Sequence, residues 1–416
     1  MKLAQIIAIL MCLALLFAAR MSSAFPVKTA AELLHERGYS DLSGKRIGLI
    51  ANHTTVVGEG RLIDLISVNK NVKLAAIFVP EHGLRGQQED GAKIAEGKDG
   101  PSGIQVYSLY GAVMKPTPEM LRGIDLLVFD IQDIGARFYT YISTMGLAMQ
   151  AAADMRIPFL VLDRPNPLGG DYVAGPILEE GQVSFTGKYP IPIAHGMTVG
   201  ELALMIQGEK MLPGLEQLDL KVVRAEGWQR AMQWPQTGLK WIRTSPNIPD
   251  FETALLYPGI CLLEGTSASV GRGTRTPFKM VGYPGIDAAE LAKRLNGRKL
   301  PGVRFDSIVF TPESLPGMSS RPAYKDRKIA GIKITVSDPR TYRSVETGIH
   351  ILGALYGLLD PAGREKFFSR SGFDHLAGTA TVRQAVSGGI LPDRIIYAWN
   401  AGVDRFLGNR AKYLLY

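Results

Sequence analysis

The sequence predicts an α/β protein: a domain with a parallel sheet, followed by a smaller α+β domain. Between residues 46 and 163, short apolar segments of strand length alternate with segments of helical pattern. This alternation is typical of crossover units in a parallel sheet. Further along, two strand-like segments, 303–310 and 329–336, follow each other without a helix between them. A chain of 416 residues, 46% hydrophobic and 21% charged, is long enough for two globular domains.

The first domain is predicted to span residues 25–245. A helix is expected over 27–37 because Gly38 follows it and stops helices. A later helix should begin at Thr198, since Thr198 and Glu201 form a capping box. The other predicted elements are strands over 46–51, 73–79, 125–130, 158–163 and 218–223, and helices over about 60–68, 117–122 and 139–155.

The second domain is predicted to span residues 246–416. Residues 225–285 are rich in Gly, Pro and Trp and lack long periodic segments, which is typical of a functional rim. The paired strands that follow indicate an α+β arrangement packed against the sheet domain. The helices predicted here lie over 287–296, 341–358, 363–370, 379–387 and 392–407.

Residues 1–24 have the outline of a secretory signal peptide. Lys2 supplies positive charge, residues 6–19 are apolar, and small residues precede Phe25. We therefore expect the mature chain to be exported, to the periplasm or outside the cell. Arg20 makes the cleavage region less regular, so an uncleaved anchor is the alternative. No other stretch has the length and apolar character of a membrane span.

The composition excludes several kinds of site. Without residues 1–24, Cys261 is the only cysteine, so neither an internal disulfide nor a cysteine-based metal site can form. Loss of Lys2 and Arg20 with that segment lowers the formal net charge from +8 to +6. This charge suits an anionic partner such as a cell-wall polymer, although a generally basic surface explains it equally well. No basic run with interleaved aromatic residues indicates nucleic acid.

No cofactor or metal ion is expected from the motifs. The strands are not followed by Gly-x-Gly-x-x-Gly, and the glycines of 271–274 lack the lysine of a nucleotide P-loop. His53, His82 and His195 could meet in space, but no His-x-x-x-His or Glu-x-x-His pair supports a metal site. The Gly-x-Ser-x-Gly elbow of serine hydrolases is also absent.

Polar residues follow four of the predicted strands, at the point where each strand ends. These polar segments are 52–54, 80–83, 130–141 and 163–167. Open parallel sheets bind their ligands at the carboxyl ends of the strands, so we expect the four segments to converge on one site. The alternative is four separate loops, since Asp, Asn, Pro and Gly also form ordinary turns.

Carboxylates are the first group of candidate site residues. Glu81 lies in a sharp turn between Pro80 and Gly83, where apolar neighbours could raise its pKa and fit it for general acid catalysis. Its neighbour His82 would lie in the same turn and contact substrate. Asp130 and Asp133 could each supply a second carboxylate. A solvent-exposed turn is the alternative for Glu81.

A second group of candidates would bind the substrate. Arg137 could grip a substrate carboxylate with two hydrogen bonds, or could be neutralised by a nearby aspartate. Tyr139 could stack on a sugar face or pack in the core. Two prolines stiffen the segment that carries Arg164 and Asn166. The Asn166 side chain could bind the amide and hydroxyls of an N-acetyl sugar, and the alternative is that it only forms a turn. His195 could point into the same cleft from the start of a helix.

The ordered motifs together resemble one family. They are Pro80-Glu-His-Gly83, the segment 130–141, Asp163-Arg-Pro-Asn-Pro167, His195-Gly-Met-Thr198, Ser245-Pro-Asn247 and Glu264-Gly-Thr266. At these positions the chain is similar to the exo-β-N-acetylmuramidase family typified by NamZ, long known as a domain of unknown function. The similarity runs from about residue 30 to the C-terminus.

The resemblance implies a Rossmann-like domain with a smaller auxiliary domain, and release of N-acetylmuramic acid from the non-reducing ends of peptidoglycan fragments. It implies Glu81 as the catalytic acid. The chain departs from the family pattern at Ser267, where we expect Asn, so the substrate range could differ. The resemblance places further residues around the pocket, namely Asp130, Arg137, Asn166, His195 and Asn247.

This implied reaction agrees with the residues themselves. Glycoside hydrolysis needs a protonated carboxyl group for the leaving oxygen and a second carboxylate for water or for the anomeric carbon. Glu81 could be the first, and Asp130, Asp133 or Glu264 the second. The lactyl carboxylate of muramic acid calls for a fixed cation, Arg137 or Arg164.

Two other classes of function stay open. A non-catalytic protein that binds cell-wall fragments could use the same cleft, but it would have no need of an acid in a tight turn. An esterase or amidase that acts on wall substituents would need a nucleophile, and the sequence offers no evident one.

Overall fold

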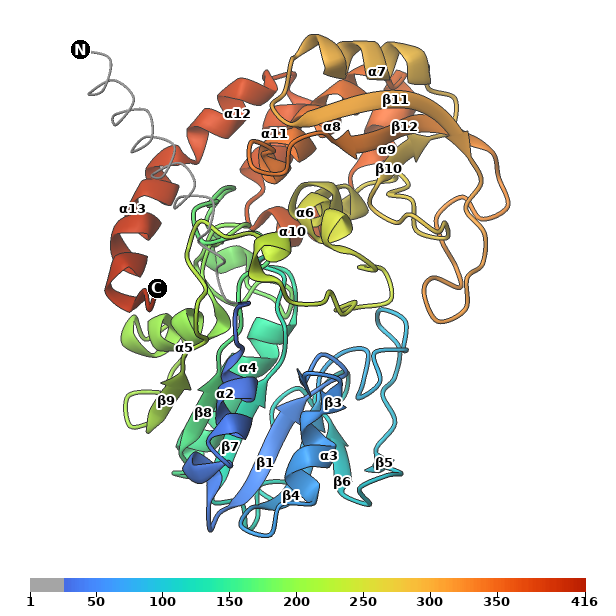
Figure 1. Cartoon of the computed structure of the whole chain (residues 1–416). Helices are drawn as coiled ribbons and strands as arrows, with labels where there is room; N and C mark the ends of the chain where they lie inside the picture. Colours follow the sequence, from blue (N-terminus) through green and yellow to red (C-terminus); the bar gives the residue numbers. More distant parts are fainter. Residues whose placement is uncertain (1–25) are drawn as a thin grey trace, which may run out of the picture.

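A seven-stranded sheet forms the core of the first domain of this computed structural model, which describes residues 26–416 (Figure 1). The predicted signal peptide, residues 1–24, lies outside the described residues. The strand order is β5-β6-β4-β1-β7-β8-β9, and all neighbours run parallel except the edge strand β5. The strands are β1 (Arg46–Ala51), β4 (Lys73–Val79), β5 (Gly97–Lys98), β6 (Gln105–Ser108), β7 (Leu126–Asp130), β8 (Phe159–Leu162) and β9 (Leu220–Val223).

The six parallel strands have the chain order 3-2-1-4-5-6, which confirms the Rossmann-like sheet. The order reverses between β1 and β7, and ligands bind outside the carboxyl ends of strands at such a switch point. A small hairpin, β2 (Val56–Val57) with β3 (Gly60–Arg61), follows β1 at this edge.

Helices cover both faces of the sheet, because alternate strand residues point to opposite sides. On one face α2 (Ala30–Glu36) and α3 (Leu62–Ser67) pack on Leu49, Ile77 and Val128. On the other face lie α4 (Tyr141–Asp154) and α5 (Val199–Gly208), and α5 begins with the predicted capping box. The apolar core of this second face continues into the C-terminal domain, so the two domains share it.

The C-terminal domain is built on a three-stranded antiparallel sheet with the order β10-β12-β11. Helices α6 and α8 cross beside it at two glycines: a Cβ atom on Gly348 would lie 2.3 Å from the carbonyl oxygen of Gly259. The elements are α6 (Phe251–Ile260), β10 (Met280–Tyr283), α7 (Ala288–Gly297), β11 (Val303–Phe310), β12 (Ile329–Val336), α8 (Ser344–Leu358), α9 (Pro361–Phe367), α10 (Arg370–Ala377), α11 (Thr381–Ser387), α12 (Pro392–Ala398) and α13 (Asn400–Arg410).

Most predicted elements are confirmed, with strands β1, β4, β11 and β12 at the predicted residues. The helix expected over 117–122 is wrong, since the segment forms only turns, between Pro116 and the start of β7. The segment 225–285, expected to lack long periodic segments and to be rich in loops, contains α6 and β10, and the single helix expected over 392–407 is divided into α12 and α13.

The end of the chain returns to the first domain. Helix α13 and the C-terminus lie beside α5 (Figure 1), and the Tyr416 hydroxyl donates a hydrogen bond of 2.7 Å to Asp163, which follows β8. In residues 26–416, which the structure describes, no helix has the length and apolar character needed to cross a membrane.

Candidate active site

The turn after β4 carries Glu81 to the carboxyl edge of the sheet. His82 and Gly83 both have positive φ angles, 68° and 71°, so the chain reverses sharply after the strand. A positive φ is unfavourable for His, and the His82 ring is tied down by a 2.8 Å hydrogen bond between Nδ1 and the carbonyl oxygen of Gln88. The loop thereby holds Glu81 in one position.

Glu81 is half-buried and its two oxygens have different partners. The Thr140 hydroxyl donates to Oε2 at 2.8 Å, and the Gly91 amide donates to Oε1 at 3.2 Å. Tyr110 lies close by. Burial, and then the nearby Glu81 carboxylate, raise the pKa of its phenol. None of these contacts is an ion pair, so the Glu81 carboxyl group is oriented without being neutralised.

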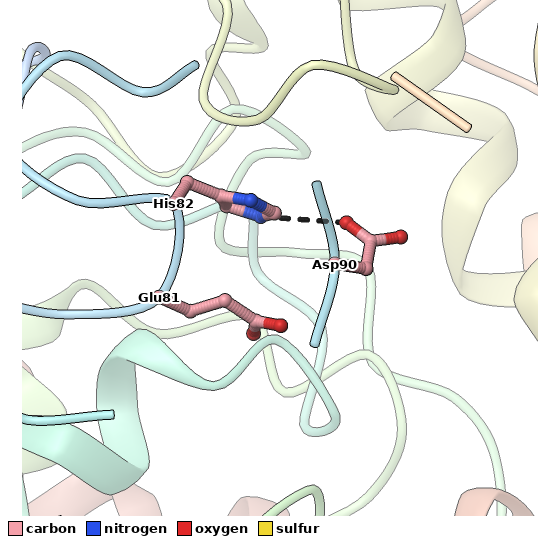
Figure 2. A group of neighbouring side chains, drawn as sticks. All are labelled: Glu81, His82 and Asp90. Carbon is pink, nitrogen blue, oxygen red and sulfur yellow. Dashed lines mark ion pairs between the residues drawn. The ribbon is translucent and has the colours of Figure 1, made fainter. Parts of the chain in front are cut away.

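A chain of polar contacts runs from His82, the neighbour of Glu81, into the C-terminal domain, and Figure 2 shows its first step, from His82 to Asp90. His82 Nε2 lies 3.6 Å from Asp90 Oδ1, and Arg272 pairs with Asp90 Oδ2. Arg272 also grips Glu264, with Nη2 3.2 Å from Oε2. The C-terminal domain therefore contacts the loop that carries Glu81.

The same loop has a second anchor on the C-terminal domain. Glu89 accepts hydrogen bonds of 2.9 Å from the amides of Gly317 and Ser320, and another from the Ser320 hydroxyl. These hydrogen bonds lower the pKa of Glu89, and the bond from the Ser320 hydroxyl has the largest effect. In Figure 1 the loop between β11 and β12 extends down toward the first domain on this side.

Asp133 and His195 form a second polar group at the sheet edge. The Gly135 amide donates to Asp133 Oδ2 at 2.7 Å, whereas Oδ1 is buried without a partner among the described residues. His195 is fully buried, and its Nδ1 accepts from the Met197 amide, so Nε2 carries the ring hydrogen. His195 Nε2 lies 3.6 Å from Asp133 Oδ2, too far for a hydrogen bond.

Several buried polar atoms without protein partners surround this group. An unpaired buried polar atom costs about 1–3 kcal/mol, so a cluster of them marks a place where water or a ligand supplies the partners. The rings of Tyr139 and Tyr141 are in edge contact, with centroids 4.9 Å apart, and flank Thr140, which links this group of buried atoms to Glu81. In the described residues the unpartnered atoms here are Asn52 Nδ2, Asp133 Oδ1, Tyr139 OH, His195 Nε2, Thr244 Oγ1 and Asn247 Oδ1.

The segment 243–247 contacts this group, since the Tyr141 hydroxyl donates to the carbonyl oxygen of Thr244 at 2.7 Å, and the segment is fixed on both sides. His53 Nε2 lies 2.5 Å from the carbonyl oxygen of Arg243, and burial lowers the pKa of His53 to about 4, so the ring is neutral and donates. Asn247 donates to the carbonyl oxygen of Met318 at 2.7 Å. Asn247 therefore joins the site to the loop between β11 and β12.

Asp130 and Arg164 correct two predictions. They form a bidentate ion pair, with distances of 2.5 and 2.9 Å, and the Asp130 side chain is fully buried. Burial raises the pKa of Asp130, and Arg164 opposes that shift. Both Asp130 oxygens bind Arg164, which favours a structural role for Asp130 over the predicted catalytic one. Arg164 uses Nε and Nη2 for this pair, so these two atoms are not available together for a substrate carboxylate.

Arg137 also departs from its prediction. Its guanidinium is fully buried and donates to the carbonyl oxygens of Pro176, Ile191 and Leu376 at 2.7–2.9 Å. It therefore pairs with neither predicted aspartate, and Nη1 and Nη2 are both used by backbone carbonyl oxygens. Since Leu376 belongs to α10, Arg137 joins the two domains instead.

Asn166 and Glu264 are structural as well. Asn166 accepts from the Leu168 amide and donates to the carbonyl oxygen of Met197, both at 3.0 Å, so it is the turn-forming residue of the alternative prediction. Glu264 is held by Arg272, and its Oε2 lies 3.4 Å from Cys261 Sγ. Among the predicted residues, the structure gathers Glu81, His82, Asp133, Tyr139, His195 and Asn247 around the site.

Sequence reasoning missed Asp90, Tyr110, Thr140 and Arg272. The signals for Asp90 and Arg272 are weak, because both lie in glycine-rich loops that resemble ordinary turns. Thr140 lies inside the quoted motif, but its contact with Glu81 spans 59 residues and could not be read from local pattern. A separate hollow of about 740 Å³ is bordered by Gln132, Arg164 and other residues and does not include Glu81.

Comparisons with known proteins place the chain in a family. The N-terminal model of the exo-β-N-acetylmuramidase NamZ matches residues 47–252, and the C-terminal model matches residues 255–416. The peptidoglycan β-N-acetylmuramidase NamZ of Bacillus subtilis (strain 168) is 41% identical over 391 residues, which cover 94% of this chain and 91% of that protein.

Two crystal structures of DUF1343 family proteins from Bacteroides fragilis have the same fold. One has a TM-score of 0.86 at 38% identity, and the other a TM-score of 0.78 at 35% identity. Each comparison covers 94% of this chain and 99% of the other. From both family models and from the relative in Bacillus subtilis it follows that this chain belongs to the exo-β-N-acetylmuramidase NamZ family.

Proposed function

We propose that this protein is an exo-acting glycoside hydrolase that releases N-acetylmuramic acid from the non-reducing ends of peptidoglycan fragments. Membership of the NamZ family supports the reaction and the substrate class. One observation carries the assignment of the site. Of the four carboxylates predicted from sequence, Asp130 and Glu264 are held by arginines, whereas Glu81 and Asp133 have no arginine partner in the described residues.

Glu81 is the proposed general acid. In its protonated form it would give its proton to the glycosidic oxygen as the bond to the anomeric carbon breaks. Thr140 and Gly91 fix the direction of the carboxyl group, which a proton transfer over hydrogen-bond distance requires.

Asp133 is the proposed second carboxylate. Its buried Oδ1 has no protein partner, and it could either take a proton from an attacking water or attack the anomeric carbon itself. The first route inverts the configuration of the released sugar and the second retains it. NMR of the first-formed anomer distinguishes the two routes.

The proposed partners of the sugar are buried polar atoms near Asp133. Tyr139 OH, Asn52 Nδ2 and Thr244 Oγ1 can bind hydroxyl or acetamido groups, since none is used within the described residues. Arg137 binds backbone carbonyl oxygens and Arg164 binds Asp130, so we assign recognition of the lactyl carboxylate to neither guanidinium.

The test uses two matched fragments that differ only in the non-reducing sugar, muramic acid in one and glucosamine in the other. We expect free N-acetylmuramic acid from the first fragment, detected by mass spectrometry, and little product from the second. Internal fragments without free muramic acid would contradict exo action. Saturable binding without any product would favour the non-catalytic wall-binding protein.

Export is the second part of this proposal. It is supported by the sequence of residues 1–24 alone, with Lys2 before an apolar stretch and small residues before Phe25. N-terminal sequencing of the protein purified from its native cells should begin near Phe25. An intact N-terminus on protein recovered from membranes would favour the uncleaved anchor.

A further inference from the structure

We propose that Glu81, His82 and Asp90 bind a divalent transition metal ion of the zinc class, and that the bound ion inhibits hydrolysis. The inhibition rests on the proposed function, whereas the binding does not. One ligand atom from each residue lies within 4.8 Å of the other two. In Figure 2 the Glu81 carboxyl group and the His82 ring both point toward Asp90 across the loop.

The His82 ring is oriented as a metal ligand would be. Nδ1 lies 2.8 Å from the Gln88 carbonyl oxygen, which can only accept, so Nδ1 carries the hydrogen and Nε2 keeps its lone pair. Metal-binding histidines are commonly fixed by such a bond from the other ring nitrogen to a backbone carbonyl.

The spacing of His82 and Asp90 suits two ligands of one ion. Nε2 and Oδ1 are 3.6 Å apart, too far for a hydrogen bond. Two ligands about 2.0–2.2 Å from a tetrahedral zinc ion lie roughly 3.4 Å from each other. The two atoms could therefore bind one ion after a small adjustment.

The charges around the group also favour a cation. Two carboxylates, those of Asp90 and Glu264, contact one guanidinium, that of Arg272, and the Glu81 carboxylate lies within 4.8 Å of Asp90. Arg272 contacts Asp90 through Oδ2, which leaves Oδ1 for an ion. A divalent ion would balance the two negative charges that Arg272 leaves over.

The ligand set points to the class of ion. One imidazole and two carboxylates suit zinc and similar transition ions, whereas calcium and magnesium prefer oxygen ligands alone. Bound carboxylates must be deprotonated, and Glu81 needs its proton to act as a general acid. An ion held by Glu81 would therefore withdraw the acid from the reaction.

Calorimetry and equilibrium dialysis with zinc, on the full chain after treatment with a chelator, test the binding. We expect one ion per chain, with affinity lowered by about tenfold or more in Asp90→Asn and in His82→Asn. Asn is chosen at 82 because it tolerates a positive φ. Absence of stoichiometric binding to the wild-type chain would overturn the site.

Glu89→Gln is the matched control. Glu89 is the neighbour of Asp90 in the same loop, and its replacement by Gln removes one negative charge, as Asp90→Asn does. Its carboxylate contacts Gly317 and Ser320 and is not a proposed ligand. The zinc affinity of the Glu89→Gln variant should stay within about threefold of the wild type. This variant therefore distinguishes loss of a ligand from loosening of the loop. Equal weakening in Glu89→Gln and Asp90→Asn would overturn the assignment of ligands.

Inhibition is measured on the same samples. Zinc should suppress hydrolysis over the concentration range in which it binds, and a chelator should restore it. Hydrolysis that is stimulated by zinc, or unaffected at full occupancy, would overturn the inhibitory role. Because calorimetry needs no turnover, a chain that binds zinc but cleaves no muramic acid glycoside would refute the proposed function alone.

Discussion

The carboxyl edge of the sheet has two unlike parts. After β4, the turn holds Glu81 with neutral hydrogen-bond donors and leaves its charge unpaired. Asp130, the last residue of β7, is locked to Arg164, and Asp163, which follows β8, accepts hydrogen bonds from Thr198, Gly200 and Tyr416. Carboxylates that lie at or just after the end of a strand are therefore half-buried in one part and fully buried and tightly bonded in the other. Their partners make this difference, not their position relative to the strand.

The largest effect is expected at Glu81. Glu81→Gln keeps the size of the side chain and its contacts but removes the transferable proton, so turnover should fall by about 10²-fold or more. Steady-state rates on a muramic acid glycoside measure this, with thermal unfolding as the check that folding is intact. Turnover near that of the wild type would place the acid elsewhere and remove the contrast between the two parts.

Asp130 and Asp133, three residues apart, sharpen the comparison. Asp133→Asn should reduce turnover by about 10²-fold with little change in stability. Asp130→Asn leaves the buried Arg164 without its counter-charge, so it should cost about 3–5 kcal/mol of unfolding free energy. Denaturant unfolding and steady-state rates are measured on both variants. A loss of stability in Asp133→Asn together with a loss of turnover alone in Asp130→Asn would refute the assignment of a catalytic and a structural aspartate.

Arg137 separates a structural role from substrate recognition. Arg137→Lys removes the planar group that reaches three carbonyl oxygens, so we expect a loss of about 1–3 kcal/mol in stability. The remaining folded enzyme should keep the same preference for muramic acid over glucosamine substrates. A selective loss on the muramic acid substrate would restore Arg137 as a carboxylate-binding residue.

The smallest effect is expected at Tyr416. Tyr416→Phe removes a donor to Asp163 and an acceptor for the Ala225 amide, which should cost about 1–2 kcal/mol and leave turnover unchanged. Differential scanning calorimetry with parallel rate measurements tests this. A loss of turnover without a loss of stability would bring Asp163 into the chemistry.

The same variant has a defined pH dependence. Burial raises the pKa of Asp163 to about 6, so the folded protein binds this proton more tightly than the unfolded chain does, where the pKa is about 3.9. Stability from this group is therefore present below about pH 4 and declines as the pH rises through about 6. Loss of the Tyr416 donor should extend that decline to higher pH, measured as the difference between variant and wild type.

The sequence alone determined the sheet and the position of its functional edge. Local patterns encode both: apolar segments between turns fix β1, β4, β7 and β8, and Thr198 with Glu201 fixes the start of α5. The turn that carries Glu81 was predicted in the same way, because Pro80 and Gly83 enclose it. Each of these signals lies within a few neighbouring residues.

Only the tertiary structure decided which polar residues are free. Asp130 and Arg164 are 34 residues apart, and Asp90 and Arg272 are 182 apart, so no local pattern reveals either pair. The carbonyl oxygens that surround Arg137 belong to both domains and meet only after folding. Burial and pairing set the state of a charged group, and both depend on residues that the fold brings together from distant parts of the chain.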